Sequence, residues 1–316
     1  MDNLRCVLCP VDFSEATAFG INVGESLARR FRVPLTLLHV LPHLPLPLRL
    51  PMDLGPLYEQ WDTEAKERLE ALAADVRKRG VATTTEITRG GPIHQIIVME
   101  EDRDCDLIVM PTHGRAGLDR LLHGSIAEGV VRVARGPVLT VPPTLEGLEP
   151  FDPQRILVAT DFSDAAERAF AAAVQLAERY ASDLVVAHVF TFQQIGEHGS
   201  EWFLPTFTKE QVEQAIGEVT RRLEKLAQRA QQLGVAASTD VSQGSSPARE
   251  IARLASEEEV DLVVVASHGE GLLKRALLGS TTSKLVRFCP RPLLMIPGGT
   301  DEPFPECLEA LAPAGC

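Results

Sequence analysis

The sequence predicts two tandem α/β domains, each an open, Rossmann-like sheet of five parallel strands with helices on both faces. Three observations lead to this fold class. The chain of 316 residues is too long for one small core, its two halves repeat the same motifs, and short apolar runs alternate with helical patterns in each half. We expect domains at 1–145 and 154–298, a linker at 146–153 and a flexible tail at 299–316.

The internal repeat extends over nearly the whole of both halves. Asp12 in CVLCPVDFS matches Asp161 in ILVATDFS, and LTLLHV matches LVVAHV at the same offset. Farther on, His113 in DLIVMPTHG matches His268 in DLVVVASHG at a slightly larger offset, so the second copy carries a short net insertion. Because the matches are collinear, chance similarity explains them poorly.

The elements of the first half follow from the hydrophobic pattern and from helix start and stop signals. The apolar run at 6–11 predicts a strand buried on both faces. Ser14 is expected to cap the first helix, while Gly80 ends the second helix and Pro92 opens the third. The other strands are expected at 35–40, 83–87, 107–110 and 138–141, and the helices at 16–31, 59–80, 92–101 and 125–134.

The second half repeats this alternation, which favours a parallel sheet with right-handed crossovers. Its strands are expected at 156–160, 184–189, 238–241, 262–266 and 293–296. Ligands of open parallel sheets bind beyond the carboxyl ends of the strands, where the strand order reverses. The residues after the first and fourth strands of each copy are therefore the candidate site.

Composition and charge argue against several classes of function. The formal net charge of −13 argues against nucleic acid as a partner, since duplex binding depends on clustered Lys and Arg. No apolar run reaches the roughly 18 residues of a membrane helix, and the N-terminus does not resemble a signal peptide. We expect a cytoplasmic protein without membrane contact.

Six cysteines are scattered along the chain, and Cys6 and Cys9 have CxxC spacing. On a strand, residues three apart point to opposite faces, so these two thiols are badly placed to share a metal. A structural or redox role for this pair stays open, but small buried hydrophobic residues are the preferred interpretation.

The chemistry of the candidate site rests on a loop after the fourth strand. Nine residues separate Gly114 from Gly124-Ser125 in the first copy, and nine separate Gly269 from Gly279-Ser280 in the second. Glycine permits close approach to a phosphate, and the start of the next helix adds N–H donors and a positive dipole end. A turn with an N-cap is the simpler explanation of one Gly-Ser pair, but its recurrence favours a phosphate loop.

These residues resemble the ATP-binding motif of the universal stress protein family, and the similarity to a tandem member covers essentially 1–298. The family pattern is G-x2-G-x9-G-[ST], preceded by an aspartate after the first strand, on a fold of the adenine nucleotide alpha hydrolase type. Pro111 and Ala266 replace the leading glycine, and proline removes a backbone N–H. The sequence has no GxxxxGK[ST] loop and no GxGxxG after the first strand.

By this resemblance the ligand is ATP or a related adenine nucleotide, with or without Mg²⁺. The strand ends would flank adenine and ribose, each aspartate would accept from a hydroxyl or the adenine amino group, and the loop would hold the phosphates. A helix N-terminal charge or cap is the alternative role for each aspartate. The implied site residues are Pro10, Val11, Asp12, Val40, Met110, Gly114, Arg115, Gly124, Ser125 and Ile126 in the first copy, and Thr160, Asp161, Val189, Val265, Gly269, Gly279, Ser280 and Thr281 in the second.

The two loops differ in charge. Arg115 follows the first His-Gly and suits a triphosphate, whereas Glu270 in the second loop would repel one. We therefore expect the first copy to be the better ATP site, despite Pro111.

The preferred function is a stress-response sensor or regulator that binds ATP without efficient turnover. The alternatives are a slow ATPase and a nucleotide-free scaffold for another ligand or partner. His113 and His268 have no identifiable serine-and-acid arrangement, so we expect no catalytic residue. The resemblance also implies pairing of the two domains through their fifth strands, with further self-association of the chain. The Pro-rich stretch 41–56 and the aromatic stretch 190–207 are lids, partner surfaces or ordinary loops.

Overall fold

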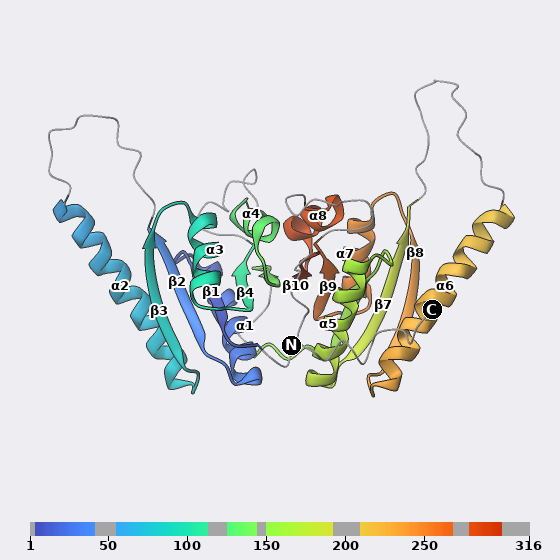
Figure 1. Ribbon diagram of the computed structural model, residues 1–316, viewed down its shortest axis with the longest axis horizontal. Coiled ribbons are helices and arrows are strands. Elements are labelled where there is room, and N and C mark those ends of the chain that lie inside the picture. Colours follow the sequence, from blue (N-terminus) through green and yellow to red (C-terminus); the bar gives the residue numbers. More distant parts are fainter. Residues whose placement is uncertain are drawn as a thin grey trace, which may run out of the picture. The chain divides into compact units, whose positions relative to one another are not determined.

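The protein is represented by a computed structural model that describes residues 4–41, 55–112, 125–143, 150–191, 209–267 and 278–298. These residues form two compact units, divided between Asp152 and Pro153. Each unit is an α/β fold whose five strands form parallel pairs (Figure 1). The expected tail, most of the Pro-rich and aromatic stretches, and both His-Gly segments lie outside the described residues.

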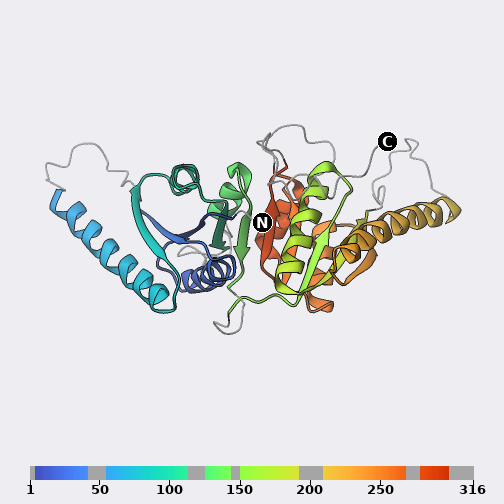
Figure 2. The same ribbon diagram turned by 60° about the horizontal axis from the view of Figure 1, so that its bottom comes forward.

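The first unit alternates strands and helices along the chain. Its elements are β1 (Val7–Val11), α1 (Ala16–Phe31), β2 (Leu35–Leu41), α2 (Gly55–Lys78), β3 (Thr83–Arg89), α3 (Pro92–Asp102), β4 (Leu107–Pro111), α4 (Ser125–Val133) and β5 (Val138–Val141). The strand order is β3-β2-β1-β4-β5, so the order reverses between β1 and β4, where Val7 pairs with Leu107. Helices α1 and α2 cover one face of this sheet, and α3 and α4 cover the other (Figure 2).

The second unit has the same topology. Its elements are β6 (Arg155–Ala159), α5 (Asp164–Tyr180), β7 (Asp183–Phe190), α6 (Lys209–Gln232), β8 (Ala237–Gln243), α7 (Pro247–Glu257), β9 (Leu262–Ala266), α8 (Ser280–Phe288) and β10 (Leu293–Ile296). The strand order is β8-β7-β6-β9-β10, with the reversal between β6 and β9.

The core of each unit is built on the apolar strands at the centre of its sheet. Residues of β1, β4, β6 and β9 are almost all buried, because helices cover both faces of these central strands. In the second unit a run of buried alanines in α5, including Ala169 and Ala173, presents small side chains to the sheet. The structure confirms the predicted fold class, and β5, β9 and β10 have the predicted bounds.

The prediction that Ser14 caps the first helix is wrong. Glu15 occupies the cap position with a helical φ of −59°, and the amide of Thr17 donates to the Ser14 carbonyl at 3.1 Å rather than to its hydroxyl. In the second unit the equivalent Ser163 does cap α5, because its Oγ accepts from the Ala166 amide at 3.2 Å.

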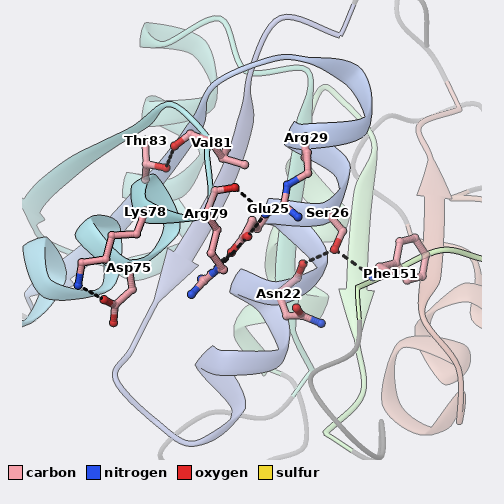
Figure 3. Close-up of polar contacts among 10 residues, drawn as sticks. All are labelled: Asn22, Glu25, Ser26, Arg29, Asp75, Lys78, Arg79, Val81, Thr83 and Phe151. Carbon is pink, nitrogen blue, oxygen red and sulfur yellow. Dashed lines mark hydrogen bonds and ion pairs between the residues drawn. The ribbon is translucent and has the colours of Figure 1, made fainter.

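A buried carboxylate ties α1 to the end of α2 (Figure 3). The side chain of Glu25 is 7% exposed and lies between the guanidinium groups of Arg29 and Arg79. The Arg79 Nε donates to the two carboxylate oxygens at 2.9 and 2.8 Å, and its Nη2 donates to Oε2 at 2.6 Å. Beside it, the Phe151 amide donates to the Ser26 hydroxyl at 2.9 Å, which holds the residues after β5 against α1.

Candidate functional site

In each unit the candidate site lies at the carboxyl ends of the two strands between which the strand order reverses. In the first unit β1 ends at Val11 and β4 at Pro111, and in the second unit β6 ends at Ala159 and β9 at Ala266. Because β1 and β4 are parallel, as are β6 and β9, the turns that follow them leave the sheet at the same edge.

The aspartate after β1 organises a tight turn. Asp12 Oδ1 accepts from the Ser14 amide at 3.0 Å, from the Ser14 hydroxyl at 2.6 Å and from the Thr17 hydroxyl at 2.9 Å. Between them Phe13 adopts a left-handed φ of 60°, which costs a non-glycine residue roughly 1–2 kcal/mol. The three hydrogen bonds to one oxygen stabilise this turn and show that Asp12 has a structural role.

The second unit repeats the turn without the threonine hydroxyl. Asp161 Oδ1 accepts from the Ser163 amide at 3.1 Å and from its hydroxyl at 2.6 Å, and Phe162 has a φ of 64°. The residue equivalent to Thr17 is Ala166, which has no hydroxyl to donate. The same local sequence, Asp-Phe-Ser, therefore produces the same backbone in both units.

A histidine at the end of the second strand supports each turn. His39 Nδ1 donates to the Val11 carbonyl at 2.7 Å, and His188 Nδ1 donates to the Thr160 carbonyl at 2.7 Å. Because a carbonyl oxygen only accepts, Nδ1 carries a proton in both rings, and in a neutral ring Nε2 is then an acceptor. These hydrogen bonds give His39 and His188 a structural role.

An aromatic and cationic column is built on each histidine. The ring centres of Phe13 and His39 are 4.3 Å apart, and the Arg68 guanidinium lies over the Phe13 ring, 4.3 Å from its centre. In the second unit Phe162 and His188 are 5.0 Å apart and stacked, and Arg222 lies 3.8 Å from the Phe162 ring centre. Because Arg68 and Arg222 come from α2 and α6, the column links the long helix of each unit to the turn after the first strand.

Sequence reasoning did not identify the phenylalanines and arginines of this column as part of the site. A signal was present, since Asp-Phe-Ser occurs in both copies and Arg68 and Arg222 stand at the same spacing before Gly80 and Gly234. The pairing of helix and turn, however, depends on tertiary packing and has no local pattern.

The first unit accommodates Pro111 by leaving space on α1. Gly20 lies opposite the proline ring, and a Cβ at Gly20 would come within 3.0 Å of Pro111 Cδ. The strand continues past this point, because Pro111 pairs with Val141 and the Thr112 amide donates to the Val141 carbonyl at 3.0 Å. The proline therefore extends β4 without breaking the sheet.

In the second unit a hydrogen bond joins the two ends of the Gly-Ser loop. The Gly279 amide donates to the Ser267 carbonyl at 2.9 Å, which places the start of α8 directly at the end of β9. The Thr282 hydroxyl donates to the Ala266 carbonyl at 2.9 Å and anchors the first turn of the helix. The first amides of α8, at Ser280 and Thr281, belong to the set that has no acceptor within a helix.

The structure distributes the other predicted site residues between the core and the surface. Met110 and Val265 are buried, Val40 and Val189 are half-buried, and Ser125, Ile126 and Ser280 are exposed at helix starts. Gly114, Arg115, Gly124 and Gly269 lie outside the described residues, as do His113, His268 and Glu270.

Within the described residues, no group of three or more His, Cys, Asp or Glu side chains is arranged to hold a metal ion. No helix in the described part of the chain is both long enough and apolar enough to cross a membrane.

Comparison with known proteins gives the same division of the chain. The model of the Universal stress protein family matches twice, at residues 3–142 and 153–297. Universal stress protein Rv2623 of Mycobacterium tuberculosis is 27% identical over 296 residues, which are 92% of this chain and 95% of the relative. Universal stress protein MJ0531 of Methanocaldococcus jannaschii is 31% identical over 138 residues, 43% of this chain and 80% of that protein.

A solved structure shares the fold over both units. The crystal structure of a universal stress protein from Archaeoglobus fulgidus DSM 4304 has a TM-score of 0.70 and 22% identity, and the alignment covers 94% of this chain and 100% of that one. Since the family model matches both halves, this chain belongs to the universal stress protein family as a tandem member with two family domains.

Proposed function

We propose that the chain binds an adenine nucleotide, ATP in the first place, and acts in the cytoplasm as a sensor or regulator of a stress response without efficient turnover. The observation that carries this proposal is the same arrangement in both units. An aspartate turn follows the first strand, and a helix whose first residue is serine follows the fourth, both at the edge where the strand order reverses.

The start of α8 supplies the donors that a phosphate needs. Gly279 is buried and extended with φ −59° and ψ 143°, so no side chain stands between a ligand and the first helical amides. The amides and hydroxyls of Ser280 and Thr281, with the positive end of the helix dipole, suit a phosphate. In the first unit Ser125 and Ile126 begin α4 in the same way, and there the neighbouring Arg115 favours a triphosphate.

Efficient turnover is not supported by the residues present. Phosphoryl transfer needs cations placed on the transferring group, and the sequence lacks the lysine of a Walker loop. His39 and His188, near the carboxyl ends of β2 and β7, use Nδ1 to hold the end of the first strand of each unit. We therefore propose that occupancy, rather than product, is the signal.

The test is native mass spectrometry of gently purified full-length protein, followed by calorimetric titration with ATP. We expect a retained mass of an adenine nucleotide and binding that is tighter at the first unit. Ser125→Ala and Ser280→Ala each remove a hydroxyl from one phosphate site, and each should weaken ATP at its own site about tenfold. Ser256→Ala is the matched control, since that exposed hydroxyl donates to the Ala252 carbonyl within α7.

The outcomes separate the three candidate functions. No retained nucleotide and no heat of ATP binding in the wild-type protein would sink the proposal in favour of a scaffold. Sustained phosphate release that Ser125→Ala abolishes would instead establish an ATPase.

A further inference from the structure

The first unit contains a pair of buried thiols that come from distant parts of the chain. Cys6 immediately precedes β1 and Cys105 precedes β4, and both side chains are buried, with exposures of 6% and 4%. The Asp106 amide donates to the Cys6 carbonyl at 3.2 Å, so the peptide that follows Cys105 lies against Cys6. Each thiol shifts the pKa of the other, so the two side chains lie close together, and the Cys6 sulfur is 3.4 Å from the Thr36 hydroxyl oxygen. We propose that Cys6 and Cys105 are a peroxide-sensitive pair that forms a reversible disulfide.

The backbone is placed for this bond. β1 and β4 are neighbouring parallel strands, and neighbouring strands lie about 4.8 Å apart. Because Val7 pairs with Leu107, Cys105 stands one residue away from the position opposite Cys6, and a rise of about 3.3 Å per residue puts the two Cα atoms roughly 6 Å apart. This separation falls within the range of about 4.4–6.8 Å that a disulfide requires between its Cα atoms.

Cys6 is the nucleophile of the pair. The neighbouring Cys105 thiol, the Thr36 hydroxyl at 3.4 Å and the charge of Arg103 lower the pKa of Cys6 against the opposing effect of burial. The neighbouring Cys6 and burial raise the pKa of Cys105, which therefore keeps its proton as the resolving thiol. A thiolate at neutral pH is the form that peroxides oxidise.

The two cysteines are next in sequence to a solvent-exposed ion cluster. Arg5 and Asp104, the residues that precede them, have side-chain exposures of 58% and 71%. Arg5 pairs with Asp104 and Asp106 across the amino ends of β1 and β4. The thiols therefore stand one residue away from side chains that water and small oxidants reach.

The reaction balances with hydrogen peroxide as the oxidant. The Cys6 thiolate attacks one peroxide oxygen, the O–O bond breaks, and hydroxide leaves and takes a proton to become water, giving a sulfenic acid on Cys6. The Cys105 sulfur then attacks the Cys6 sulfur, the S–O bond breaks, and the Cys105 proton leaves with the hydroxide as a second water. Two thiols are oxidised to one disulfide and one peroxide is reduced to two waters.

The neighbouring CxxC cysteine provides an internal control. Cys9 is fully buried, and burial raises the pKa of its thiol to about 12. The second unit has Arg155 and Val260 in place of Cys6 and Cys105, so it has no equivalent pair. Cys289, the described cysteine of that unit, is buried with a pKa raised to about 11.

The experiment treats the reduced full-length protein with hydrogen peroxide, blocks the remaining thiols with N-ethylmaleimide and maps tryptic peptides by mass spectrometry. We expect a linked pair of peptides, the one beginning at Cys6 and the one beginning at Asp104, that dithiothreitol separates. Cys9→Ser should retain the link, and Cys6→Ser should abolish it. Cys105→Val, which introduces the residue of the second unit, should abolish the link and leave a Cys6 sulfenic acid that dimedone traps.

Two results would overturn the proposal. One is a wild-type protein whose Cys6 and Cys105 both remain fully alkylatable after peroxide treatment. The other is a link between Cys6 and Cys9 that persists in Cys105→Val. Neither result depends on nucleotide binding, because the pair lies at the amino ends of the strands and the candidate nucleotide site lies at their carboxyl ends.

Discussion

The two units share one backbone but differ in pairs of side chains that contact one another. In each case both members of a pair change together between the units. The pairs are Glu25–Arg79 against Val174–Leu233, Gly20–Pro111 against Ala169–Ala266, and Cys6–Cys105 against Arg155–Val260. Joint changes of this kind are expected of residues in contact, because a change to one partner alone can leave a clash, a cavity or an unpaired charge.

The unusual backbone positions, by contrast, are the same in both units. The residue after the first aspartate is left-handed in each, with φ 60° at Phe13 and 64° at Phe162. The residue that ends the first helix is also left-handed, although it is Arg32 in one unit and Ala181 in the other. The path of the chain is therefore a property of the fold, and the contacting pairs are separate local solutions within it.

The largest effect should come from breaking the buried ion pair of the first unit. Arg79→Leu leaves the Glu25 carboxylate with Arg29 alone, and we expect a loss of about 2 kcal/mol in the free energy of unfolding. This is below the roughly 3–5 kcal/mol of a fully buried pair, because the Arg79 side chain is 52% exposed. Glu25→Val with Arg79→Leu should be more stable than Arg79→Leu, since it also removes the buried carboxylate that has lost one of its two arginines.

Urea unfolding of the three proteins measures this difference. Lys78→Leu is the control, because Lys78 pairs with Asp75 on the surface and its loss should change the free energy by less than about 0.5 kcal/mol. A double variant no more stable than Arg79→Leu contradicts the role assigned to the pair.

An intermediate effect is expected where Gly20 faces Pro111. Gly20→Ala gains helix propensity but forces its Cβ to within 3.0 Å of Pro111 Cδ, so alone it should be neutral or destabilise by about 1 kcal/mol. In a Pro111→Ala background the same change should stabilise by about 1 kcal/mol, because it recreates the alanine pair of the second unit. Thermal unfolding of the wild type, Gly20→Ala, Pro111→Ala and the double variant measures the coupling free energy between the two residues.

Gly217→Ala in α6 is the control for propensity, since an added Cβ there meets nothing within 4 Å. If Gly20→Ala has the same effect in both backgrounds, the two residues are not coupled and the exchange of pairs is coincidental.

The smallest effect concerns pH. Burial raises the pKa of Glu100, while the amides of Gly136 at 2.7 Å and Arg135 at 3.3 Å oppose that shift. A carboxyl whose pKa is higher in the folded state stabilises that state at acid pH and loses this contribution as pH rises through the raised pKa. Glu100→Gln should therefore become more stable relative to wild type as pH rises from about 4 to 7.

Urea midpoints of both proteins across this range measure the effect. In the second unit Ala255 stands at the equivalent position, so that unit lacks this contribution. A wild-type to Glu100→Gln difference that stays constant with pH would show that Glu100 does not titrate differently on folding.

Much of the fold was predictable from the sequence, and what could not be predicted were contacts of individual side chains. The bounds of β9 and β10 and the stop at Gly80, with φ 89°, follow from apolar runs and glycine chemistry. The cap at Ser14 was mispredicted because a serine before a helix looks the same whether its hydroxyl or its carbonyl receives the first free amide. The edge that carries the candidate site followed from strand alternation, whereas the column of Arg68 on Phe13 did not.

The sequence by itself determined the duplication, the alternation of strands and helices, and the family, because each is written in local runs and recurring motifs. Only the tertiary structure decided that the peptide after Cys105 lies against Cys6, and that Glu25 is buried between two arginines. The physical reason is that β1 lies beside β4 and α1 lies beside the end of α2 through crossover connections. Contacts made by such connections join residues that are distant along the chain, and no periodicity in the sequence records them.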